Sequence, residues 1–273
     1  MNIINAVILG IVQGITEFLP VSSSGHLVLL QKIFGITEPA LFFDTMLHLG
    51  TLAAVFAVLH KDIWAVLKKP VQPLTGFLLL ATIPVVVFAL VFGKTVEHIF
   101  ETGSFLGWAF LATSALLTFA DYITKRAAGI NCLKKAENMN WIDALIIGLL
   151  QAIAIVPGIS RSGATISGAL SRRLDKDFAG RFSFLLSIPA ILGAVVLQTK
   201  DILKFGITHE TERGEISIMT VIVGAIIAAV VCFFAIRFML KIIREKSLRP
   251  FAVYTAALGL FILFDQFKTH LIF

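Results

Sequence analysis

The sequence predicts an all-α integral membrane protein, with about six transmembrane helices and two re-entrant helical hairpins that meet near the midplane of the bilayer. Composition is the first observation: 58% of the 273 residues are apolar, 15% are charged, and the mean hydropathy is +0.92. A soluble domain of this length could not bury so much apolar surface, so lipid must be the solvent for much of the chain. The other two observations are a set of long apolar runs and one broken segment that occurs twice.

Each apolar run is long enough to cross a bilayer as one helix. Pro84 and Pro189 fall inside two of these runs and are expected to kink those helices locally. The six runs are residues 41–59, 74–93, 104–124, 179–199, 216–236 and 251–268.

The broken segment covers roughly residues 3–34 and 141–173. In both copies Gly-x-x-Gln is followed by an apolar stretch, a proline and then Ser-x-Ser-Gly. The proline, Pro20 or Pro157, ends one helix, and the serines after it cap the next. Each half is then about as long as half a bilayer, because a helix rises about 1.5 Å per residue. Both copies are therefore predicted to be re-entrant hairpins whose irregular tips are buried in protein or face water.

The similarity between the two halves continues beyond the hairpins, since the segment from Phe43 to Ile63 resembles the segment from Phe182 to Ile202. We therefore expect a single membrane domain over residues 1–273. It is expected to consist of a first repeat at 1–125 and a second, inverted repeat at 140–273.

Charge predicts the orientation of these repeats. Lys and Arg cluster in four loops, near 61–69, 125–135, 172–176 and 241–249, whereas loops predicted at 94–103 and 200–215 carry a slight acidic excess. With the basic loops in the cytoplasm, each repeat has three spans and both termini lie outside. Because each repeat has an odd number of spans, the second repeat begins on the opposite side of the membrane from the first. The first hairpin therefore enters from outside and the second from the cytoplasm. The net charge of +6 thus reflects topology, and no nucleic-acid partner is expected.

The first hairpin carries a candidate nucleophile–base set. Gln13 and Glu17 lie at i and i+4 on one face of a half-helix. Ser22 and Ser23 stand where the next helix is capped, and His26 lies one turn further, within reach of either serine. An ionisable group at membrane depth is costly and is expected to face a protein-lined cavity, which favours a catalytic role. The alternative is structural: the serines only cap the helix, and Glu17 is paired.

The second hairpin places Arg161 at the N-terminal end of a half-helix, among the hydroxyls of Ser160, Ser162 and Thr165. Unpaired N–H groups, the helix dipole and a planar guanidinium all favour an oxyanion, and phosphate is the anion that fits this set best. The alternative is an Arg161–Glu17 ion pair that only locks the two hairpins together.

Two further patterns have two interpretations each. Asp44 and His48 form another i, i+4 pair at the start of the first span, which suits either a role beside the site or an ion pair near the interface. Gly163 and Ser167 present small side chains that suit helix packing within one chain or in a homodimer.

The hairpin motifs resemble those of the BacA/UppP family of undecaprenyl-diphosphate phosphatases. They are Gln13-x-x-x-Glu17, the segment from Pro20 to His26, and the segment from Pro157 to Thr165, and the resemblance extends over essentially the whole chain. It implies an integral enzyme of the bacterial inner membrane, with an active site that opens towards the periplasm. Such an enzyme removes the terminal phosphate of undecaprenyl diphosphate, returns undecaprenyl phosphate to cell-wall synthesis, and confers bacitracin resistance when abundant. The expected partners are therefore a polyprenyl diphosphate and membrane lipid.

The resemblance also implies roles for individual residues. Glu17 matches a glutamate that serves as base or metal ligand, Ser23 a proposed nucleophile, and His26 a proposed acid/base or alternative nucleophile. Arg161 matches an arginine that binds the phosphates. The expected catalytic residues are thus Glu17, Ser23, His26 and Arg161, and the expected phosphate-binding residues are Gln13, Ser22, Ser160, Ser162 and Thr165.

Some family members carry a second glutamate at the position of Gln13, and its replacement weakens any mechanism that needs two carboxylates on one ion. With Glu17 as the only motif carboxylate, Mg²⁺ or Ca²⁺ is expected to be bound largely through substrate phosphates and water. The alternative function is a polyprenyl-phosphate flippase or transporter without hydrolysis, because inverted repeats with midplane half-helices are transporter architecture.

Overall fold

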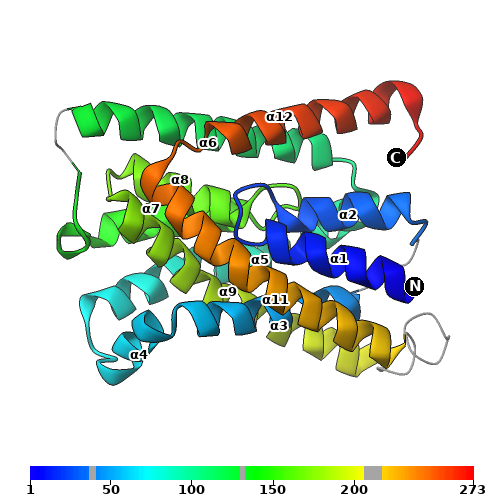
Figure 1. Cartoon of the computed structure of the whole chain (residues 1–273), viewed down its shortest axis with the longest axis horizontal. Helices are drawn as coiled ribbons and strands as arrows, with labels where there is room; N and C mark the ends of the chain where they lie inside the picture. The colour runs from blue at the N-terminus through cyan, green and yellow to red at the C-terminus, as the bar shows by residue number, and fades with distance from the viewer. Residues whose placement is uncertain (37–40, 130–132, 206–216) are drawn as a thin grey trace.

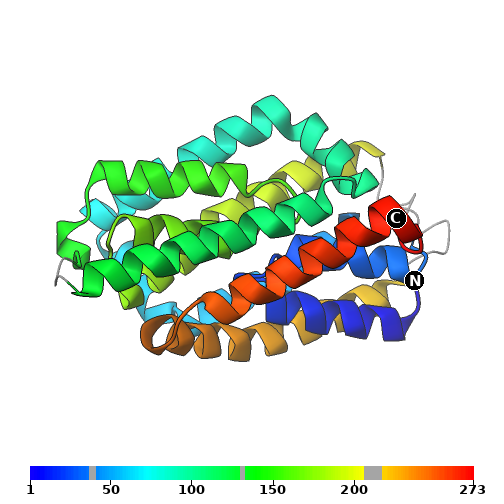
Figure 2. The ribbon, with the colours of Figure 1, turned by 90° about the horizontal axis from the view of Figure 1, so that it is seen from above.

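The computed structural model describes residues 1–36, 41–129, 133–205 and 217–273, and these ranges form a bundle of packed helices (Figures 1 and 2). No β-strand forms within them. The helices are α1 (Ile3–Thr16), α2 (Ser23–Ile33), α3 (Leu41–Val58), α4 (His60–Lys68), α5 (Pro73–Thr102), α6 (Leu106–Gly129), α7 (Trp141–Ile153), α8 (Arg161–Ser171), α9 (Lys176–Phe205), α11 (Ile218–Glu245) and α12 (Arg249–Phe264), with a short 3₁₀ turn at Ala136–Asn138 and a π turn at Asp265–Thr269.

Five of these helices, α5, α6, α9, α11 and α12, are long and apolar enough to cross a membrane. The pair α3–α4 is a sixth candidate, although the chain bends by 78° between its two helices. The outer face of α5 is covered with exposed apolar side chains, among them Leu79, Ile83 and Leu90. Such a surface is stable only in lipid, so the chain is a multi-pass membrane protein. The six predicted apolar runs all fall on these helices, which confirms the predicted class.

Two details of the predicted spans differ from the structure or extend beyond it. The loop predicted at 94–103 is wrong, because α5 continues to Thr102 and ends at Gly103, whose φ of 64° closes the helix. The polar residues near 94–101 are compatible with a helix, and the glycine that follows them marks its end. The loop predicted at 200–215 lies largely outside the described residues, and α9 extends to Phe205.

Both predicted breaks are present. In the first half, α1 ends at Thr16 and α2 begins at Ser23, where the hydroxyl of Ser22 accepts a hydrogen bond from the N–H of Gly25. In the second half, Ser160 caps α8 in the same way, through the N–H of Gly163. Each proline thus lies within its break, four residues after the end of the first helix, and the serine that precedes the second helix caps it, as predicted.

The two halves of the chain are packed into each other. Helix α1 lies along α11, and α7 lies along α5, so the first helix of each broken segment contacts a span of the other half. Glycines allow these close approaches: a Cβ at Gly10 would lie 2.6 Å from the carbonyl oxygen of Gly224, and one at Gly148 would lie 2.5 Å from that of Ala81. Helices α6 and α12 pack side by side across one face of the bundle (Figures 1 and 2).

The two breaks converge against α6. A Cβ at Gly25 would lie 2.7 Å from the ring of Phe110 and 3.0 Å from the Cα of Gly158. Gly158 itself has a φ of 93° and packs against Ala109. The small-residue face at Gly163 and Ser167 is buried within the chain. The N- and C-termini lie at the same end of the bundle (Figures 1 and 2).

Candidate active site

Glu17 is the centre of the candidate site. It follows α1 directly, at the start of the first break, and its side chain is only 4% exposed. The next residue, Phe18, is fully buried and meets the ring of Phe184 from α9 edge-on. This anchor fixes the chain as it leaves the helix, so that the carboxylate of Glu17 faces the second break.

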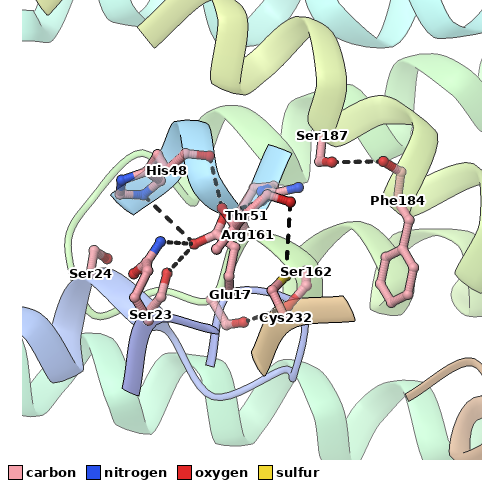
Figure 3. Close-up of polar contacts among 12 residues, drawn as sticks. Glu17, Ser23, Ser24, His48, Thr51, Arg161, Ser162, Phe184, Ser187 and Cys232 are labelled. Atoms are coloured by element: carbon pink, nitrogen blue, oxygen red, sulfur yellow. Dashed lines mark hydrogen bonds and ion pairs between the residues drawn. The ribbon is translucent and has the colours of Figure 1, made fainter. Parts of the chain in front are cut away.

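Residues of both broken segments donate to this carboxylate (Figure 3). Arg161 Nη2 lies 2.5 Å from Glu17 Oε1, and the hydroxyl of Ser23 donates to Oε2 over 2.5 Å. The side-chain amide of Gln13 donates to the same Oε2 over 2.9 Å. The structure thus brings together four of the residues that the two sequence motifs predict, from hairpins that are far apart in the chain.

Arg161 is the first residue of α8. Its guanidinium lies over the ring of Phe18, with 5.4 Å between the central carbon and the ring centroid. The ion pair with Glu17, which was the structural alternative to an anion site, does form. Even so, Nη1 is buried and has no hydrogen-bond partner among the described residues. A buried donor left over beside an ion pair suits an anionic ligand, because a guanidinium can bind two oxygens at once.

The hydroxyls around the breaks hold the tips together in this structure. Ser162 donates to the carbonyl of Leu19 over 3.0 Å, and its oxygen lies 3.2 Å from that of Ser160. Thr165 is fully buried, with its hydroxyl 2.5 Å from that of Ser183 on α9. A phosphate-binding role for these hydroxyls, and for Ser22, which caps α2, stays a prediction.

His26 lies on α2 with both ring nitrogens engaged. Nδ1 is 2.6 Å from the backbone carbonyl of Ser22, and Nε2 is 2.7 Å from the hydroxyl of Tyr254 on α12. The carbonyl can only accept, so Nδ1 carries the hydrogen and Tyr254 donates to Nε2. The serine that His26 reaches is thus Ser22, through its backbone. An acid/base role for His26 stays a prediction, and it requires Tyr254 to release Nε2.

His48 of α3 also reaches the carboxylate, although it was not among the predicted site residues. Its Nε2 lies 3.6 Å from Glu17 Oε2 (Figure 3), and its Nδ1 lies 2.7 Å from the backbone carbonyl of Asp44. The carboxylate of Asp44 accepts from the side-chain amide of Gln31, at 2.9 and 3.1 Å. The i, i+4 spacing of Asp44 and His48 was a signal of something functional, but no local pattern relates His48 to Glu17.

The side chains of the site offer little to a divalent cation. Across the described ranges, no group of three His, Cys, Asp or Glu side chains could hold a metal ion. Both oxygens of Glu17 already face protein donors. The side chains present therefore do not form a protein cage for a metal, and a cation could be held here only with oxygens from the substrate and water.

A known protein family matches this chain over most of its length. The family described as "Bacitracin resistance protein BacA" matches residues 6–261, a range that contains both breaks and all the residues of the candidate site. The chain belongs to this BacA family. The resemblance drawn from the hairpin motifs is thereby confirmed.

Relatives of this BacA-family chain match it over nearly their whole length. The undecaprenyl-diphosphatase of Carboxydothermus hydrogenoformans is 44% identical over 266 residues, which cover 97% of this chain and 98% of the relative. Undecaprenyl-diphosphatase 3 of Bacillus cereus is 45% identical over 267 residues, 98% of each chain. The undecaprenyl-diphosphatase of Alkaliphilus metalliredigens is 39% identical over 278 residues, which cover 95% of this chain and 97% of the relative.

Proposed function

We propose that this chain is an undecaprenyl-diphosphatase, a hydrolase that removes the terminal phosphate of undecaprenyl diphosphate. The products are inorganic phosphate and undecaprenyl phosphate, which is reused as the lipid carrier of cell-wall synthesis. The observation that carries the proposal is the buried carboxylate of Glu17, which joins Ser23 of one hairpin to Arg161 of the other. The names of the relatives support the substrate, and the BacA description supports a link to bacitracin resistance.

Binding of the diphosphate is proposed to depend on Arg161 and on the helix end where it stands. Its Nη1 is the donor without a partner among the described residues, and α8 adds the positive end of its dipole. Fixed donors of this kind stabilise the charge that develops during phosphoryl transfer, and this stabilisation usually contributes more to catalysis than any other effect. The hydroxyls of Ser22, Ser160, Ser162 and Thr165 and the amide of Gln13 are proposed to complete the phosphate site.

For the chemical step we propose that Ser23 attacks the terminal phosphorus and Glu17 takes its proton, because the two groups already share a 2.5 Å hydrogen bond. The Ser23–phosphorus bond forms as the bridging oxygen leaves with its electron pair on undecaprenyl phosphate. Water then displaces Ser23 from phosphorus. Ser23 regains its proton from Glu17, inorganic phosphate departs with the oxygen of water, and one proton goes to solvent.

We further propose that the broken segments are re-entrant hairpins of two inverted repeats, 1–125 and 140–273. The matching breaks and the matching close approaches at Gly10 and Gly148 support this arrangement. The basic segment of α4 and the basic connection from α11 to α12 lie toward the end opposite the termini (Figure 1). With basic segments in the cytoplasm, the first hairpin enters from outside, and the site opens to the periplasmic side of the inner membrane.

A divalent cation, Mg²⁺ or Ca²⁺, is proposed to arrive with the substrate. It would supply charge neutralisation on the phosphate oxygens and would be held by those oxygens and water, with the carboxylate of Glu17 as a further oxygen ligand. What supports this proposal is the set of side chains at the site: among the described residues there is no cluster of three acidic, His or Cys groups that could hold a metal ion, and both oxygens of Glu17 already accept from protein groups.

The test is phosphate release from farnesyl or undecaprenyl diphosphate by detergent-purified protein, with Mg²⁺, with Ca²⁺ and with EDTA. Wild type is compared with Glu17→Ala and with Glu137→Ala, a control at an exposed glutamate. We expect release by wild type and the control, and none by Glu17→Ala. A folded wild-type protein that binds the lipid without releasing phosphate would contradict the phosphatase activity. That result would favour the alternative function, a polyprenyl-phosphate flippase or transporter.

A further inference from the structure

His48 stands beside the atom that is proposed to take the nucleophile's proton. Its Nε2 lies 3.6 Å from Oε2 of Glu17, the oxygen that receives the hydroxyl of Ser23. The side chain of His48 is 30% exposed, whereas that of Glu17 is 4% exposed. His48 comes from α3 and so reaches the carboxylate from outside both hairpins (Figure 3).

The hydrogen-bond partner of Nδ1 determines what Nε2 can do. Nδ1 lies 2.7 Å from the carbonyl oxygen of Asp44, one turn earlier on the same helix. A carbonyl oxygen only accepts, so Nδ1 carries the hydrogen, and when the ring is neutral Nε2 is an acceptor that faces Glu17. The separation of 3.6 Å between Nε2 and Oε2 is longer than a hydrogen bond.

We propose that His48 is a positioning residue of the phosphatase reaction, whose Nε2 accepts a hydrogen bond from Glu17 once Glu17 has taken the proton of Ser23. The inference rests on the proposed function and adds a residue to it. As the Ser23 O–H bond breaks and the Ser23–phosphorus bond forms, the proton moves to Oε2. The new carboxylic acid then finds an acceptor beside it, which it reaches by closing about 0.7 Å to an ordinary bond length of roughly 2.9 Å.

The timing of this bond predicts its kinetic effect. Before proton transfer two acceptors face each other and nothing is gained, whereas after transfer the acid donates to the imidazole. An interaction made only as the reaction proceeds raises kcat and leaves substrate binding unchanged. The loss of His48 should therefore appear in kcat and not in KM.

The test uses the full-length protein and steady-state phosphate release, with His48→Leu, which lacks an acceptor, and His48→Gln, whose amide oxygen supplies one. We expect His48→Leu to lower kcat about tenfold or more, with KM within about twofold of wild type. His48→Gln should recover most of kcat. If His48→Leu does not fold, it is replaced by His48→Met, because the methionine side chain is about as long as that of histidine.

His60 provides a matched control, because its Nδ1 also meets a carbonyl of its own chain segment, that of Ala57 at 3.0 Å, but it is exposed on α4. His60→Leu should leave both constants unchanged. A wild-type kcat in His48→Leu would overturn the role of His48, and so would equal losses of kcat in His48→Gln and His48→Leu. Neither result would affect the proposed phosphatase function. A folded wild type that binds the lipid and releases no phosphate would overturn the proposed function and this role together.

Discussion

The hydroxyl of Thr113 accepts a 3.0 Å hydrogen bond from the backbone N–H of Ser160. The same oxygen lies 3.2 Å from the carbonyl of Gly158, to which it can donate. Thr113 belongs to α6 and is fully buried, and Ser160 immediately precedes Arg161. One side chain of α6 therefore holds the backbone that leads into Arg161.

Replacement of Thr113 by valine keeps the shape of the side chain and removes this clamp. The N–H of Ser160 is left buried without a partner, which costs about 1–3 kcal/mol of stability. A small displacement of Arg161 should lower kcat/KM roughly tenfold. Thr113→Ser keeps the hydroxyl and serves as the control. Phosphate release and thermal unfolding of the two variants check this, and a fully active Thr113→Val protein would show that the tip holds its position without Thr113.

Arg161→Lys tests the guanidinium. A lysine can pair with Glu17 but has no second nitrogen to offer to a phosphate, so we expect kcat/KM to fall by a factor of about 100 or more. Arg237→Lys is a suitable control, because Arg237 lies on α11 and contacts the ring of Phe233. Both variants are assayed at several substrate concentrations. Near-normal turnover of Arg161→Lys at saturating substrate would contradict the role given to Arg161.

Ser23→Ala tests the nucleophile. If Ser23 forms the bond to phosphorus, turnover should fall by at least roughly a hundredfold. The neighbouring Ser24, whose hydroxyl lies 3.3 Å from that of Ser22, has no proposed role, so Ser24→Ala should remain active. Substantial residual release by Ser23→Ala would transfer the nucleophilic role to His26 or to water.

Gly148→Ala tests the close approach of α7 to α5. The added Cβ would lie 2.5 Å from the backbone oxygen of Ala81, so the helices must separate, and overpacking of this kind costs about 1–3 kcal/mol. Gly193→Ala adds the same methyl group to α9, where nothing lies within 4 Å. Thermal unfolding in detergent should show a lower midpoint for Gly148→Ala alone. Equal unfolding midpoints for the two variants would mean that α7 and α5 can move apart at little cost in stability.

The sequence predicted the parts of the site that depend on local chemistry. Pro20 and Pro157 lie within the breaks, and Ser22 and Ser160 cap the helices that follow, so both breaks are found where the motifs place them. The pairing of Glu17 with Arg161 was also foreseen, as a structural alternative to an anion site. Both inferences use only the preferences of helix ends and the attraction of opposite charges.

Three residues that shape the site could not be predicted in this way. His48, Thr113 and Tyr254 reach it from α3, α6 and α12, and their contacts depend on how those helices pack. A helical pattern in the sequence shows which face is apolar, but it does not show which residue of a distant helix that face will meet. The i, i+4 spacing of Asp44 and His48 therefore left two interpretations open, and the packing of α3 placed His48 at Glu17.

The exchange of helices between the halves, α1 against α11 and α7 against α5, has a consequence for assembly. Each half therefore supplies the span along which the first helix of the other half lies, so a chain severed between α6 and α7 would lose both of these contacts. The carboxylate of Glu17 and the guanidinium of Arg161, which form an ion pair, would then belong to different polypeptides. Helix α1 therefore has its full set of contacts only when α11, from the second half of the chain, is present.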